Sequence, residues 1–68
     1  MIKNDFITID PEIQNGLPVF TGTRVPIDIL FDHIETGSTL DEFLDDFPSV
    51  SKSHAIAVLE FLKSVAVA

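Results

Sequence analysis

Apolar residues recur with helical spacing through the second half of the chain, in three successive segments. Apolar positions at i, i+3, i+4 and i+7 predict helices over residues 26–36, 39–46 and 51–66. In the first two segments this spacing is carried by Ile27, Leu30, Phe31 and Ile34, then by Leu40, Phe43, Leu44 and Phe47. The pattern therefore predicts a mainly α fold.

Boundary residues support the same three helices. Pro26 suits a first helical turn, and Gly37 provides the left-handed residue that ends a helix. Thr39 and Glu42 form a capping box at the start of the second segment. Ser51 is a favourable N-cap for the third.

The first 25 residues follow a different pattern. The stretch "DFITIDP" at 5–11 is rich in β-branched residues and predicts a short strand, and "PVF" at 18–20 predicts a second. We expect residues 1–25 to form an extended or β arm and a Gly/Pro loop, followed by a three-helix unit over 26–68, within one domain over 1–68. The short turn "PSVS" between the last two predicted helices gives the outline of a helix-turn-helix preceded by one helix.

The third predicted helix carries more apolar surface than two short helices cover. Plotted at 100° per residue, its core stripe consists of Ala55, Val58, Leu59, Leu62 and Ala66. The apolar residues beside or opposite this stripe are Ala57, Phe61 and Val65, and Ile56 and Val67. We expect these surplus residues to contact a partner protein, and we expect a homodimer.

Charge is distributed unevenly along the 68 residues, whose net charge is −7. Residues 25–51 contain seven acids and no lysine or arginine, whereas the four other acids balance the four cations. The negative electrostatic field of residues 25–51 repels nucleic-acid phosphates and attracts basic partners. Asp41, Asp45 and Asp46 therefore join the candidate partner-binding residues.

The stretch "GLPVFTGTRVPI" at 16–27 surrounds Arg24, the chain's single arginine, with glycines and prolines. A phosphate-binding loop is disfavoured because the glycines lie six apart and a proline starts the following helix. The predicted structural loop residues are Gly16, Pro18, Gly22, Thr23, Arg24 and Pro26. We expect Thr23 to cap the first helix, and Arg24 to pair with a carboxylate such as Asp10 or Asp28.

No catalytic or metal-binding constellation emerges from the pattern. His33 and His54 fall on different predicted helices, the chain has no cysteine, and two ligands do not make a metal site. No nucleophile lies beside a base, so we expect a protein that is not an enzyme and needs no cofactor. The sequence contains neither a membrane-spanning apolar run nor a signal-peptide core, so we expect a cytoplasmic protein.

The stretches "IDPEIQNGLPVFTGTRVPI" and "GSTLDEFLDDFPSVS" resemble the small bacterial and archaeal proteins called domain of unknown function 433. The matching residues are Asp10, Pro11, Glu12, Gly16, Pro18, Val19, Gly22, Thr23, Arg24, Pro26, Gly37, Phe47 and Pro48. The chain departs from the family pattern at Asn15, where a glycine is usual, and at Thr21, where a basic residue is common.

The resemblance implies a homeodomain-like helix-turn-helix and, for many members, an antitoxin that binds and silences a PIN-like ribonuclease toxin. We therefore expect an antitoxin whose partner is a basic toxin. The alternative is a helix-turn-helix repressor that meets DNA through Lys52, Ser53 and His54. The acidic field makes DNA binding by the chain alone weak.

Overall fold

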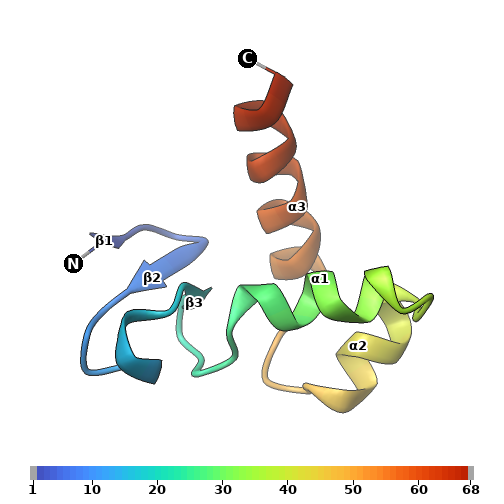
Figure 1. Cartoon of the computed structure of the whole chain (residues 1–68), viewed down its shortest axis with the longest axis horizontal. Helices are drawn as coiled ribbons and strands as arrows, with labels where there is room; N and C mark the ends of the chain where they lie inside the picture. The colour runs from blue at the N-terminus through green and yellow to red at the C-terminus, as the bar shows by residue number, and fades with distance from the viewer. Residues whose placement is uncertain (1, 68) are drawn as a thin grey trace.

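The computed structural model describes residues 2–67 and shows three helices beside a small antiparallel sheet (Figure 1). The helices are α1 (Ile27–Glu35), α2 (Leu40–Asp46) and α3 (Lys52–Val67), and the strands are β1 (Ile2–Lys3), β2 (Ile7–Ile9) and β3 (Val19–Phe20). The predicted mainly α class and the three predicted helices are confirmed. No helix within residues 2–67 is long and apolar enough to cross a membrane.

The helix ends follow from local hydrogen bonds. Thr39 and Glu42 form the predicted capping box, in which the Glu42 N–H donates to Thr39 Oγ1 over 3.1 Å. The Ser51 hydroxyl accepts the His54 N–H over 3.1 Å, which caps α3. After α1, Gly37 has a φ of 87°, and its N–H donates to the carbonyl of Ile34. This left-handed residue ends the helix as predicted.

The N-terminal arm is more ordered than the sequence predicts. β1, which the hydrophobic pattern does not reveal, pairs antiparallel with β2, and β2 pairs antiparallel with β3. Between β1 and β2 the side chain of Asn4 accepts the N–H groups of Phe6 and Ile7 over 2.8 and 2.7 Å. This turn fixes the register that places Ile2 opposite Ile9.

The core lies where β3 meets all three helices. Its buried apolar residues are Phe20, Ile27, Leu30, Phe43, Val50, Ala55 and Val58. The Phe20 and Phe43 rings lie 5.9 Å apart and join the sheet to α2. Burying a side chain of this size contributes about 1.5–3 kcal/mol, so these contacts hold α3 against the body at its N-terminal end. In Figure 1 the other end of α3 extends away from the body.

Three local predictions need correction. Pro26 has a φ of −64° and a ψ of 140°, so it is extended and lies before α1 as its N-cap instead of within the first turn. Ile34 and Ala66, predicted on apolar stripes, are both exposed. Ile34 occupies the last turn of α1, and Ala66 lies near the end of α3 that no other element covers.

Candidate protein-binding groove

An apolar groove of about 340 Å³ lies between the sheet, α1 and α3. Its lining residues are Ile7, Ile9, Pro18, Ile27, Asp28, Phe31 and Leu62. Ile7 and Ile9 line it together because strand residues two positions apart project from the same face. Asp28 is the single charged side chain in this lining. The groove can therefore receive an apolar side chain and present a carboxylate to a neighbouring cation.

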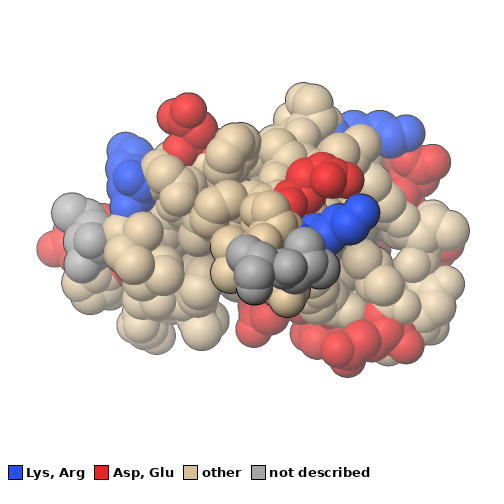
Figure 2. Space-filling view, turned by 90° about the horizontal axis from the view of Figure 1, so that it is seen from above, with Lys and Arg blue, Asp and Glu red and all other residues tan. Residues whose placement is uncertain are grey.

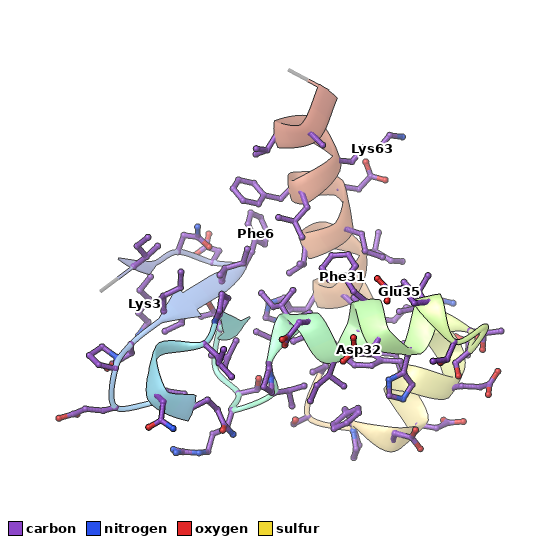
Figure 3. The ribbon with its side chains drawn as sticks, in the orientation of Figure 1. Lys3, Phe6, Phe31, Asp32, Glu35 and Lys63 are labelled. Atoms are coloured by element: carbon purple, nitrogen blue, oxygen red, sulfur yellow. The ribbon has the colours of Figure 1, made fainter. Side chains whose placement is uncertain are left out.

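Apolar surface continues from the groove along α3. The Phe61 ring lies 6.1 Å from the ring of Phe6, so the N-terminal sheet covers part of the surplus apolar arc. Phe61 is still 38% exposed, and Val65, one turn further, is 61% exposed. The groove and this strip form one apolar surface that the residues 2–67 leave partly uncovered. Figure 3 shows Phe6 directed toward α3 and Phe31 on the side of α1 that faces α3.

Acidic side chains border this surface along α1. Asp28, Asp32 and Glu35 are all exposed, and their spacing of four and three residues places them on one side of the helix. Figure 2 shows a run of acidic groups along the lower edge of the molecule and further acidic groups elsewhere on the same face, while the visible lysines and arginines are scattered singly. A basic protein that approaches the groove therefore meets favourable potential at its rim.

The predicted acidic contacts on α2 are partly occupied within the chain. Asp41 Oδ1 lies 3.6 Å from Lys52 Nζ, and Asp46 Oδ2 lies 3.2 Å from His33 Nε2. Asp45 is exposed and forms no salt bridge with any residue from 2 to 67. Of these three acids, only Asp45 is thus wholly available to a partner.

His33 joins α1 to α2. Its Nδ1 lies 3.0 Å from the Ile29 carbonyl and its Nε2 faces the Asp46 carboxylate, so both ring nitrogens meet acceptors. Only the protonated ring can donate to both. The Ile29 carbonyl, and next the Asp46 carboxylate, raise the pKa of His33 above its ordinary value of about 6.5.

The predicted apolar contacts on α3 do not form one patch. Ile56 is 42% exposed but lies about 140° around the helix from Phe61, on the side away from the sheet. Ala57 is half-buried. The side chain of Val67 lies outside the described residues. Sequence periodicity identified Phe61 and Val65, but it missed the groove because five of its lining residues come from the arm and from Pro18 to Asp28.

The residues proposed to meet DNA have contacts inside the chain. Lys52 pairs with Asp41, and the Ser53 hydroxyl lies 3.3 Å from that of Ser51. His54 is half-buried, its Nε2 lies 2.9 Å from the Phe6 carbonyl, and its ring meets the edge of Phe20. These contacts make His54 a link between α3 and the sheet.

Several residues of the Gly/Pro loop form turns and backbone hydrogen bonds. Gly16 and Gly22 have φ angles of 88° and 85°, and the Pro18 carbonyl accepts the Ile27 N–H. Thr23 Oγ1 accepts the Val25 N–H over 3.0 Å, so Thr23 closes a turn before α1 and does not cap that helix.

Arg24 differs most from its expected role. It is exposed, and neither salt bridge found within residues 2–67 involves it, so neither Asp10 nor Asp28 is its partner. The prediction failed because the loop turns the Arg24 side chain outward.

Within the described residues, no three His, Cys, Asp or Glu side chains lie close enough together to hold a metal ion.

The comparisons with known proteins give one match. A family model described as "Protein of unknown function (DUF433)" matches residues 7–62. No curated protein and no solved structure matches the chain.

Proposed function

The chain belongs to the DUF433 family, and from this premise we propose that it is an antitoxin that binds and neutralises a basic, PIN-like ribonuclease toxin in the cytoplasm. The observation that supports this proposal most is the apolar groove bordered by acids. Its lining contains Asp28 and no cation, and Phe61 and Val65 extend its apolar surface along α3. Such a surface suits a partner whose apolar side chain is flanked by lysine or arginine.

The two kinds of contact have different kinetic roles. Carboxylates at the rim steer a cationic partner into the encounter and affect mainly the association rate. Apolar burial in the groove and against Phe61 slows dissociation. Asp28→Asn should therefore slow capture of the ribonuclease, whereas Phe61→Ala should speed release.

An inhibition assay tests the proposal. The purified chain is added to the product of the neighbouring open reading frame, which the proposal expects to be a PIN-like ribonuclease, and RNA cleavage is followed with the wild type, Asp28→Asn and Glu60→Gln. Glu60→Gln is the matched control, because it removes one exposed carboxylate about 160° around α3 from Leu62. We expect inhibition by the wild type and by Glu60→Gln, and weaker inhibition by Asp28→Asn. Cleavage that the wild-type chain leaves unchanged would refute the function.

The alternative is a homeodomain-like helix-turn-helix repressor. The order of three helices and the short turn before α3 favour this possibility. The internal contacts of Lys52 and His54 and the acidic field weaken it for the chain alone. We therefore rank operator binding second, and we assign it to a complex in which the ribonuclease supplies basic surface.

We also propose that two copies associate through the end of α3. Val65 is 61% exposed there, and Ile2 on the edge strand is 57% exposed. Burial of such residues between copies would remove apolar surface that one copy leaves in water.

A further inference from the structure

A second hollow, of about 300 Å³, lies on the other side of β2 from the apolar groove. It is lined by Lys3, Thr8, Asp10, Ile13, Gly22, Thr23 and Arg24. The alternation of β2 explains the two different surfaces, because Ile7 and Ile9 project to one face and Thr8 projects to the other. Ligand pockets begin at about this volume, so the hollow suits a small molecule.

The charge around this hollow is opposite to that of the molecule. Lys3 and Arg24 are two of the chain's four cations, and Asp10 is the single acid in the lining. The lining thus carries one net positive charge in a chain whose net charge is −7. Neither cation forms a salt bridge with any residue of the described chain, although eleven acids are present. Both cations are therefore available to an anion.

Two backbone donors of the lining are also uncommitted. Within the described part of the chain, no protein group accepts the backbone N–H of Gly22 or of Arg24. Asp10 is partly engaged, because its Oδ1 accepts the Glu12 N–H over 2.9 Å. The Thr21 hydroxyl donates to the Asn4 carbonyl, so the Thr8 hydroxyl must donate to the Thr21 oxygen. The Thr8 hydroxyl can therefore only accept a hydrogen bond from a ligand.

The turn at residues 14–16, whose first side chain contacts the Arg24 carbonyl, has left-handed backbone angles. Gln14 and Asn15 have φ angles of 50° and 56°, which non-glycine residues rarely adopt, and Gly16 follows at 88°. The Gln14 side chain reaches across and donates to the Arg24 carbonyl over 3.0 Å. Strained backbone of this kind persists where the surrounding structure fixes it, and it is common at ligand sites. The backbone of Arg24 is therefore fixed, while its exposed side chain faces solvent.

We propose that this hollow binds the oxyanion of a small ligand, either a phosphate monoester or a carboxylate. The Arg24 guanidinium matches two oxygens of such a group, and Lys3 adds a second charge from the edge strand. Asp10 lies where it can accept a hydroxyl or amine of the same ligand. The helix N-terminus that usually completes a phosphate-binding loop has no part in this site. The proposal is independent of the ribonuclease-binding function.

The test is a titration of the full chain followed by amide NMR, at constant ionic strength, with inorganic phosphate in one series and acetate in the other. The variants are Arg24→Gln and Lys3→Gln, and the matched control is Lys63→Gln. Lys63 is also exposed, but it lies on α3, well away from Lys3 (Figure 3). Because both lining cations are exposed, we expect each variant to keep the wild-type fold, and the same spectra verify this.

We expect saturable shifts of the Gly22, Thr23 and Arg24 amides, with a dissociation constant on the order of 1 mM for so small a probe. Arg24→Gln should weaken binding about tenfold, the value of one charged hydrogen bond, while Lys63→Gln should stay within about twofold. Saturation by phosphate alone identifies a phosphorylated ligand, and saturation by acetate identifies a carboxylate. Shifts that do not saturate, or that Lys63→Gln reduces as much as Arg24→Gln, would overturn the site.

Discussion

At the scale of single residues, His33 connects charge to the packing of two helices. Its ring contacts the edges of Phe43 and Phe47 at centroid distances of 5.5 and 5.8 Å. Its nitrogens face the Ile29 carbonyl and the Asp46 carboxylate, and the protonated form satisfies both. The state of one proton therefore affects how α1 is held against α2.

We predict that the chain loses stability as pH rises from about 6 to about 8. The pKa of His33 is raised in the folded state, so its stabilising effect is complete below the unfolded value of about 6.5 and is lost as pH rises through the folded value. Denaturant unfolding across this range measures the change, and His33→Gln should remove most of the slope. An equal slope in the variant would show that other groups cause it.

Arg24 and Gly22 allow a second test within one loop. Arg24→Ala should change the free energy of unfolding by less than about 0.5 kcal/mol, because the side chain is exposed and unpaired within residues 2–67. Gly22→Ala should cost about 1–2 kcal/mol, since its φ of 85° is unfavourable for alanine although the added methyl meets no atom within 4 Å. Thermal or denaturant unfolding of both variants measures these two changes in the free energy of unfolding. A large loss in Arg24→Ala would restore the bracing role that the sequence suggests.

At the scale of elements, the helices depend on local signals that the sequence displays. Thr39→Ala should lower the free energy of unfolding by about 1 kcal/mol, because it removes the acceptor of the Glu42 N–H at the start of α2. Ser49→Ala is a suitable control, since the described residues give its exposed side chain no hydrogen bond. Denaturant unfolding compares the two variants. Equal losses would mean that the capping box is not the source of the effect.

The difference between local and long-range signals explains which elements could be predicted. The three helices and the β2 and β3 strands follow from periodicity, caps and β-branched residues that lie within a few positions of one another. β1 has only two residues, and its pairing depends on the turn made by Asn4, which leaves a weak signal. The groove and the hollow around Arg24 combine residues distant in sequence, from Lys3 to Leu62, so no local pattern could reveal them.

At the scale of the whole molecule, the two faces of β2 differ in chemistry. One face opens on an apolar groove beside the acids of α1, and the other opens on a hollow with two cations. In Figure 1 the far end of α3 extends from the body, beyond the cover that the sheet and α1 provide. A partner protein and a small anion can therefore use separate surfaces, whereas a second copy would cover Val65 and so share part of the apolar surface beside the groove.

We predict a homodimer that Val65→Asp converts to a monomer. Val65 is exposed in one copy, so a carboxylate there should leave the fold intact while it opposes burial between copies. Ile34→Asp is the control, because Ile34 is a similarly exposed apolar residue on α1. Light scattering at high micromolar concentration reports the mass, and a monomeric wild type would exclude the dimer.

The most direct test of the proposed function measures binding of the same purified chain to two ligands at physiological salt. The first ligand is the product of the neighbouring open reading frame, which the proposal expects to be a PIN-like ribonuclease, and the second is the chain's own promoter DNA. We predict submicromolar binding to the ribonuclease, with association that slows as salt rises, and no sequence-specific binding of the chain alone to the promoter. Submicromolar, sequence-specific binding to the promoter without binding to the ribonuclease would contradict the antitoxin function and identify a repressor.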